Sequence, residues 1–193
     1  TLMSLLMRLY DADSGLIQIG GRRLSSIPLE ELHQKFGVVF QNDVLFADSI
    51  YENIDFGRNL PPQEIEKAAR CAQALEFISA LPDGFGHMLT SKGTNLSGGQ
   101  KQRVTIGAAI VKDSPVIYFD EPTSGLDYDS MVRVSRLIEQ LSASGVIVFV
   151  VSHDFEFIVR TCTEVVQLDD QGAVQNHRLT PQILKALSEQ YFH

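Results

Sequence analysis

Two carboxylates, Asp120 and Glu121, directly follow the four apolar residues 116–119. An acidic pair in this position lies at the carboxyl edge of a parallel sheet, which is where α/β proteins bind their ligands. Asp120 is a candidate ligand for Mg²⁺, which keeps several waters and takes few protein carboxylates. Glu121 is able to orient and deprotonate a water molecule. Taken alone, the pair is better explained as two solvated acids at the end of a strand.

A second candidate site is the sequence Ser97-Gly98-Gly99, which precedes a stretch with helical character. Ser97 is a good N-cap residue, and the amides that follow it have no partner within the helix. The glycines let an anion approach the backbone, and the helix dipole adds a partial positive charge there. The pattern fits a phosphate-binding helix start, although for these three residues alone a capped helix without a ligand is the better explanation.

Two more polar residues come just after apolar strands: Gln41 follows residues 36–40, and His153 follows residues 146–151. His153 is able to stabilise charge on a transferring phosphoryl group, but a lone histidine in this position is more often structural. Gln41 alone carries almost no signal. The order and spacing of the four features change this picture, because one helix and one strand fit between Ser97 and Asp120, and one further helix–strand unit precedes His153.

The elements that must position these residues alternate between strand and helix in the second half of the chain. We expect strands at residues 15–21, 36–40, 116–119, 146–151 and 164–168, and helices at residues 1–9, 61–80, 98–111, 129–142 and 155–161, with a turn at 170–172 and a last helix from Pro181. Short, continuously apolar strands are typical of the centre of a parallel sheet. The alternation predicts an α/β fold.

Composition limits the classes of function. A length of 193 residues suits one domain, or one domain with a small inserted subdomain. The net charge of −8, from 24 acidic and 16 basic side chains, argues against a general nucleic-acid binder, which needs a basic face. No apolar run approaches the ~18–20 residues of a membrane-spanning helix. The two cysteines lack metal-ligand spacing, which favours a reduced, cytoplasmic setting.

Together, the motifs resemble those of the nucleotide-binding domain of the ABC ATPase family, and the resemblance spans essentially all 193 residues. Residues 96–103 (LSGGQKQR) match the signature motif, and residues 116–127 (VIYFDEPTSGLD) match the Walker B strand, the catalytic glutamate and the D-loop. Gln41 matches the Q-loop glutamine, and His153 matches the switch histidine. The resemblance implies a P-loop NTPase-type α/β fold, with a mainly parallel sheet, flanking helices and an inserted helical subdomain at roughly residues 42–112 of a single domain, 1–193.

The resemblance implies ATP and Mg²⁺ as cofactors and a pair of such domains that face each other head to tail. Ser97, Gly98, Gly99 and Gln100 would contact the ATP held by the partner copy, and Asp127 would link the two sites. The implied partners are a second ABC ATPase domain, identical or paralogous, and a transmembrane transporter domain. That arrangement would place the chain at the cytoplasmic side of the cell membrane, without a nucleic-acid partner.

The remaining residues would act on the ATP of their own copy. Asp120 and Gln41 would serve Mg²⁺ and the attacking water, Glu121 would be the general base, and His153 would contact the γ-phosphate. The phosphate loop of the form G-x-x-G-x-G-K-[ST] is absent from the sequence, and Thr1 is the most that remains of it. We therefore expect a fragment of a longer protein, and the chain alone to be inactive.

Rival functions are a soluble ABC ATPase and a degenerate fragment that binds a partner without hydrolysing ATP. The interval between Gln41 and Ser97 leaves no space for the long coiled coil of DNA-repair members, and intact Glu121 and His153 argue against a dead site. The transport direction stays open. Residues 43–54 and 81–84 resemble exporters, whereas residues 106–110, with Ala108 where exporters usually have arginine, and residues 119–128 resemble importers.

Overall fold

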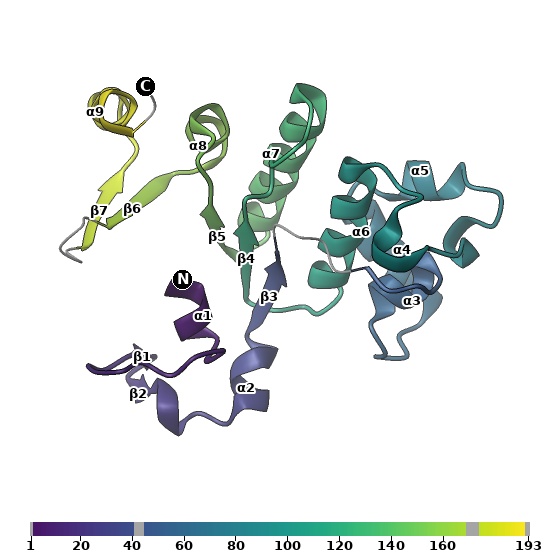
Figure 1. Ribbon diagram of the computed structural model, residues 1–193, viewed down its shortest axis with the longest axis horizontal. Helices are drawn as coiled ribbons and strands as arrows, with labels where there is room; N and C mark the ends of the chain where they lie inside the picture. The colour runs from purple at the N-terminus through teal and green to yellow at the C-terminus, as the bar shows by residue number, and fades with distance from the viewer. Residues whose placement is uncertain (1, 41–44, 169–173, 192–193) are drawn as a thin grey trace.

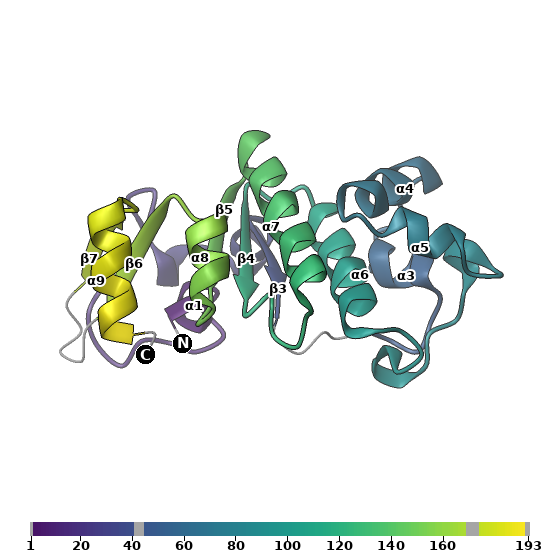
Figure 2. The same ribbon diagram turned by 90° about the horizontal axis from the view of Figure 1, so that it is seen from above.

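The computed structural model describes residues 2–40, 45–168 and 174–191. Its central sheet has three parallel strands in the order β3 (Phe36–Val39), β4 (Val116–Asp120) and β5 (Ile147–Val151). Helices lie on both sides of this sheet, and a group of short helices extends from one end (Figures 1 and 2). The prediction of an α/β fold with a parallel sheet is therefore confirmed.

Strand β4 is buried on both faces because its alternate residues serve two separate cores. Ile117 and Phe119 lie in the main core, together with residues of α6 (Gly98–Ile110) and α7 (Tyr128–Ala143). Tyr118 points to the opposite face and lies in a smaller core with Met3 of α1 (Leu2–Leu6) and Leu32 of α2 (Leu29–Gln34). Successive side chains of a strand point to opposite faces, so a parallel strand that is covered on both faces needs an apolar residue at every position.

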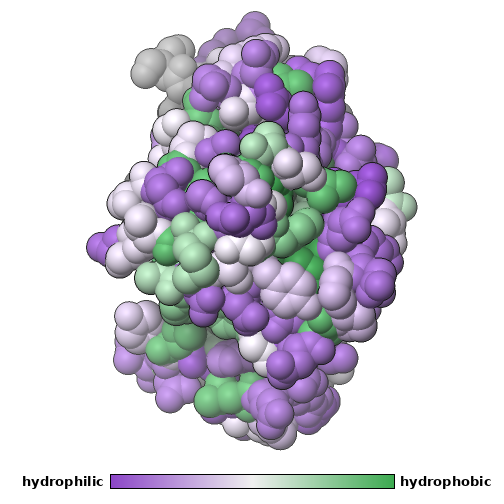
Figure 3. All heavy atoms as spheres, turned by 90° about the vertical axis from the view of Figure 1, so that its right-hand side faces the viewer, coloured by the Kyte–Doolittle hydropathy of each residue, from purple (hydrophilic) through white to green (hydrophobic). Residues whose placement is uncertain are grey.

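The group of helices at one end consists of α3 (Ile50–Asp55), α4 (Pro62–Cys71), α5 (Leu75–Ser79) and the flank of α6. Its apolar side chains are almost fully buried: Ile50, Ile54 and Ile78 are 0% exposed and Ile65 is 1% exposed. Seen from this side, the surface is mostly hydrophilic and is broken by separate hydrophobic patches (Figure 3).

The prediction of one helix over residues 61–80 is wrong, because the chain breaks between α4 and α5. Gln73 has a left-handed backbone with φ of 53°, a conformation that costs a non-glycine residue about 1–2 kcal/mol. The break turns Ala74 and Ile78 into the core, where both are 0% exposed. Burial of these two side chains offsets the strain.

The helix and the strand of the N-terminal part are shorter than predicted. The predicted helix over residues 1–9 is present only as α1, because Arg8 adopts a positive φ of 52°. The predicted strand over residues 15–21 is reduced to β1 (Gln18–Ile19), which pairs with β2 (Arg22–Arg23). Helices α2 and α3 were not predicted.

The C-terminal part contains α8 (Phe155–Thr161), β6 (Glu164–Leu168), β7 (Val174–Arg178) and α9 (Pro181–Tyr191). Strand β7, which was not predicted, pairs antiparallel with β6. The predicted turn at residues 170–172 lies outside the described residues. None of the helices in the described ranges is long and apolar enough to cross a membrane.

The two edges of the central sheet differ. Within the described residues β5 pairs with β4 alone, and its alternate residues Ile147, Phe149 and Val151 are 47–56% exposed. Such a strand presents unpaired backbone groups and apolar side chains together. Strand β3, in contrast, has helices α2 and α6 packed against it.

Candidate functional site

Glu121 and His153 meet where strands β4 and β5 end. The backbone N–H of Glu121 donates to the Val151 carbonyl at 2.8 Å, which extends the pairing of the two strands by one residue. Glu121 has a left-handed backbone with φ of 49°, and strained non-glycine residues of this kind cluster at functional sites. Its carboxylate turns toward the next strand end, where its Oε2 atom lies 2.8 Å from Nδ1 of His153.

The two side chains of this pair differ in their exposure to solvent. The side chain of Glu121 is 16% exposed, whereas that of His153 is 81% exposed. The hydrogen bond and the charge of Glu121 raise the pKa of His153, which favours the protonated imidazole. The contact places the carboxylate of Glu121 beside His153 and brings these two predicted site residues together.

Asp120, the last residue of β4, is held by a residue that the sequence analysis did not select. The Tyr118 hydroxyl donates to Oδ1 of Asp120 at 3.3 Å. Burial first, and then the charge of Asp120, raise the pKa of Tyr118 to about 12, so the phenol keeps its proton. The signal that could have identified it is a single hydroxyl in an apolar strand, two residues before the acid and hence on the same face.

One carboxylate at a sheet edge fits Mg²⁺, which binds through few protein carboxylates and several waters. Asp120 is half-buried, so it is open to solvent on one side. Within the described ranges, no group of three or more histidine, cysteine or acidic residues is placed to hold a metal ion. An ion bound at Asp120 would therefore take most of its ligands from water or from another molecule.

The start of helix α6 has the predicted geometry of a capped helix with open amides. Ser97 accepts a hydrogen bond from the Gln100 backbone at 3.3 Å, and the Gln100 side chain accepts one from the Ser97 backbone at 2.9 Å. This capping box leaves the amides of Gly98 and Gly99 to point out of the helix. A Cβ atom built on Gly98 would meet no other atom within 4 Å, so the space in front of this helix end is open.

Asp127 caps the next helix and lies beside this helix start. Its Oδ1 atom accepts a hydrogen bond from the Ser130 backbone at 2.7 Å, and this bond lowers the pKa of Asp127. A Cβ atom built on Gly99 would lie 3.4 Å from Oγ of Ser130. The N-termini of α6 and α7 are thus adjacent, and both are oriented by residues that the sequence analysis selected.

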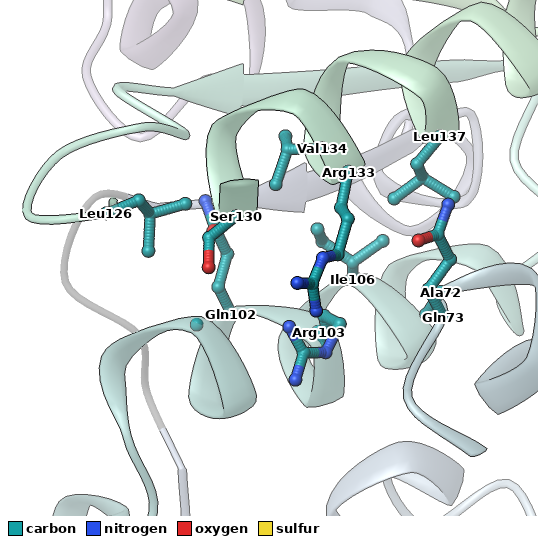
Figure 4. A pocket seen from close by; sticks show the side chains of 11 residues that line it. Ala72, Gln73, Gln102, Arg103, Ile106, Leu126, Ser130, Arg133, Val134 and Leu137 are labelled. Atoms are coloured by element: carbon teal, nitrogen blue, oxygen red, sulfur yellow. The ribbon is translucent and has the colours of Figure 1, made fainter. Parts of the chain in front are cut away.

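The side chain of Gln102, inside α6, connects this helix to the loop that follows strand β4. Its Nε2 atom donates to the carbonyl of Pro122, the residue after Glu121. Figure 4 shows this glutamine beside Arg103 and Arg133, in a small pocket between α6 and α7. The pocket has a volume of about 10 Å³, which is the room that one water molecule needs. The pocket is therefore too small for a ligand. The contact of Gln102 with Pro122 is a packing contact that holds helix α6 against the loop after β4.

Asp154 is a further polar residue of the site that sequence reasoning missed. It caps α8 by accepting a hydrogen bond from the Phe157 backbone at 3.0 Å, and it accepts a second from the Thr123 hydroxyl at 3.3 Å. Asp154, which directly follows His153, therefore connects the loop after Glu121 to the start of α8. The signal in the sequence is an aspartate directly before a short helix, which is a typical N-cap.

Two predicted site residues, Thr1 and Gln41, lie outside the described residues. The others form two groups: Asp120, Glu121 and His153 lie at the strand ends, and Ser97, Gly98, Gly99, Gln100 and Asp127 lie at the starts of α6 and α7. Carboxylates at the strand ends and a glycine-rich helix start, on a parallel sheet flanked by helices, define a P-loop NTPase-type α/β domain.

Comparisons with known proteins specify the class. The family model described as "ABC transporter" matches residues 1–124. The ATP-dependent lipid A-core flippase of Alkalilimnicola ehrlichii is 40% identical over 177 residues, which cover 91% of this chain and 30% of that protein. ABC transporter B family member 1 of Arabidopsis thaliana is 39% identical over 175 residues, which cover 90% of this chain and 13% of that protein.

A solved structure agrees with these relatives. A bacterial Atm1-family ABC exporter with ATP bound matches with a TM-score of 0.85 and 31% identity, over 98% of this chain and 32% of that one. The chain belongs to the ABC transporter family, as the motifs predicted. It spans about a third or less of the length of these relatives.

Proposed function

We propose that this chain is the ATP-binding and ATP-hydrolysing part of an ABC membrane transporter, and that it works as one of a pair. The observation that carries the proposal is the contact between Glu121 and His153 at the carboxyl end of the parallel sheet, 2.8 Å from Oε2 to Nδ1. It brings a candidate general base and a candidate charge-stabilising group together from two strands. Family membership supports the same activity.

The residues at the strand ends would divide the work on one nucleotide. Glu121 would accept the proton of the attacking water, since it lies at the sheet edge with its backbone held by β5. His153 would hold Glu121 in place and then turn to the terminal phosphate, which its largely exposed side chain permits. Asp120, oriented by Tyr118, would ligate Mg²⁺. Bound Mg²⁺ would neutralise charge on the phosphate oxygens.

The start of α6 would serve a nucleotide held by the partner copy. A Cβ atom built on Gly98 would meet no atom within 4 Å, whereas Gly99 lies beside Ser130, and the hydrogen bonds of the Ser97 cap are satisfied within the helix. A phosphate brought from another surface would complete this helix end and would be favoured by its dipole. Asp127 would connect the two sites of the pair, because it caps α7 directly beside Gly99.

We further propose that the transporter works in the outward direction and that the membrane partner carries the ATPase domain at the cytoplasmic side. The relatives named above include two whose names contain "flippase" or "exporter". Those names support export over import, although Ala108 and residues 119–128 depart from the exporter pattern. A second copy of the ATPase domain would be the other partner.

The test is ATP hydrolysis by the longer protein that contains this domain, with Mg²⁺ and with excess chelator. Glu121→Gln keeps the size of the side chain and removes the base, so turnover falls about 10²–10⁴-fold, while ATP binding persists. Glu139→Gln, an exposed change on α7, is the matched control and keeps the parent rate. A longer protein that binds no nucleotide, or a Glu121→Gln variant at full rate, would refute the proposal.

A further inference from the structure

The loop that follows strand β4, residues 121–127, carries Glu121 and is held at both of its ends. At its start, the backbone N–H of Glu121 donates to the Val151 carbonyl at 2.8 Å, and the Ser124 N–H donates back to the Glu121 carbonyl at 3.1 Å. At its end, Asp127 caps α7. The exact position of Glu121 therefore depends on what holds the middle of this loop.

Two side chains from outside the loop bind its middle. Gln102 of α6 donates from Nε2 to the carbonyl of Pro122, and Asp154 accepts a hydrogen bond from the Thr123 hydroxyl at 3.3 Å. The bond of Gln102 lies next to Glu121 in the chain and away from solvent, because Gln102 is only 7% exposed and the ring of Pro122 is fully buried. A hydrogen bond in such surroundings is electrostatically stronger than one in water.

Glu121 needs support of this kind because its backbone is strained. Its φ of 49° is a conformation that persists in a non-glycine residue only where the surrounding structure enforces it. The bond to Val151 fixes the backbone on one side, and the bond from Gln102 fixes the carbonyl of Pro122 on the other. The ring of Pro122 fixes its φ, so little freedom remains between that carbonyl and Glu121.

Packing alone does not account for a glutamine at position 102. Its Oε1 atom is buried and has no hydrogen-bond partner among the described residues. An apolar side chain of the same size would fill this space, beside the small pocket of Figure 4, without an unpaired acceptor. The interaction that only a donor supplies at this position is the bond to Pro122.

We propose that Gln102 is a positioning residue for Glu121 of the same copy. Its hydrogen bond to Pro122 holds the strained backbone that carries the base. Without this donor the loop relaxes toward an unstrained conformation, and the Glu121 carboxylate loses its alignment with the attacking water. This inference rests on the proposed function, since it concerns the base of that same site.

A role at the start of α6 is the alternative, because Gln102 belongs to the helix that Ser97 caps. The two roles concern different nucleotides. The start of α6 is proposed to serve the ATP of the partner copy, whereas Glu121 serves the ATP of its own copy. The base is favoured, because the start of α6 is already held by its own capping box, while Glu121 is the strained residue.

The first test is the ATPase kinetics of the longer protein with Gln102→Met, which keeps the length of the side chain and removes the donor. We expect kcat to fall about 10–10²-fold, because the base is misplaced, and KM for ATP to change less than about twofold. The melting temperature should stay within about 2–4 °C of the parent value, because the unpaired Oε1 atom is removed together with the bond. Gln140→Met, the same change at an exposed position of α7, is the control and keeps the parent kcat.

Val104→Ala shows what a purely structural loss in α6 does. Val104 is 0% exposed and lies in the main core, so this variant should lower the melting temperature by at least about 2 °C and keep kcat within about twofold. If Gln102→Met also melts at a lower temperature and keeps the parent kcat, Gln102 is a packing residue and the inference is wrong.

The second test identifies the nucleotide on which Gln102 acts. In a mixed dimer of a Gly98→Asp copy and a Glu121→Gln copy, the intact site takes Glu121 from the first copy. Gln102→Met in the first copy should lower turnover about 10–10²-fold, and in the second copy it should leave turnover within about twofold. An equal loss from both copies, or a loss from the second alone, would assign Gln102 to the start of α6 and overturn the inference.

Gln102→Glu keeps the first test decisive if Gln102→Met fails to fold. It retains the size and polarity of the side chain, and at about pH 8 its carboxylate is ionised and repels the Pro122 carbonyl. The same loss in kcat is expected, and an unchanged kcat would contradict the inference. An absence of ATPase activity in the parent protein would instead refute the proposed function.

Discussion

The two groups of candidate residues differ in how complete they are. At the strand ends, Glu121 is bound by His153, and Asp120 is bound by Tyr118, so each acid has a partner within the chain. At the start of α6, the cap of Ser97 is satisfied internally, whereas the space in front of Gly98 is open. The first group is assembled by its own strands, whereas the second leaves open space beside Gly98. This difference is what a site shared between two copies requires.

The largest expected effect comes from placing a negative charge at the open helix start. Gly98→Asp adds a carboxylate where a built Cβ meets no atom within 4 Å, and an acidic side chain in the first turn of a helix is stabilising by about 0.3–1 kcal/mol. The fold should therefore be kept or slightly stabilised. ATP turnover should fall at least about 10²-fold, because the carboxylate repels the phosphate that this end is proposed to receive.

Both quantities are measured on the longer protein, turnover by phosphate release and stability by thermal unfolding. Gln63→Asp, which adds a carboxylate at an exposed position in the first turn of α4, is the control for surface charge. A stable Gly98→Asp variant with the parent turnover would show that residues 97–99 only cap a helix.

A smaller effect is expected on stability when the cap itself is removed. Ser97→Ala deletes the acceptor for the Gln100 amide, which costs about 1 kcal/mol. That corresponds to a fall of about 2–4 °C in the melting temperature of a domain of this size. Ser142→Ala, at an exposed position near the end of α7, should leave the melting temperature unchanged. If the Ser97→Ala variant has the same melting temperature as the parent protein, the capping box contributes nothing to stability.

The smallest expected effect is on the titration of His153. Glu121 raises the pKa of His153, and Asp154 adds to the rise. Glu121→Gln should therefore lower this pKa toward the ordinary histidine value of about 6.5. The stabilising contact is present below the unfolded-state pKa and is lost as the pH rises through the raised one. Proton NMR of the imidazole measures the pKa of His153 in the parent protein and in the Glu121→Gln variant. The same pKa in both would show that the contact does not persist in solution.

Several features of the site could be predicted from the sequence because they are local. The apolar runs at residues 116–119 and 146–151 each end in polar residues, and parallel strands place those ends at one edge. The cap of Ser97 follows from its residue type and from Gln100 three positions later.

The features that were missed depend on contacts between distant residues. The break at Gln73 arises because the core needs Ala74 and Ile78, and no glycine or proline marks it. The bond from Thr123 to Asp154 joins two loops that only the sheet brings together. The roles of Thr1 and Gln41 stay predictions.

We expect each ATP site to take Glu121 from one copy and the start of α6 from the other. This expectation is tested by two purified mixed dimers of the longer protein, isolated with two different tags. One pairs a Gly98→Asp copy with a Glu121→Gln copy, and the other pairs an unchanged copy with a copy that carries both changes. We expect the first dimer to hydrolyse ATP, because one of its two sites is intact, and the second dimer to be inactive. Activity in the second dimer and none in the first would contradict it, because each site would then lie within a single copy.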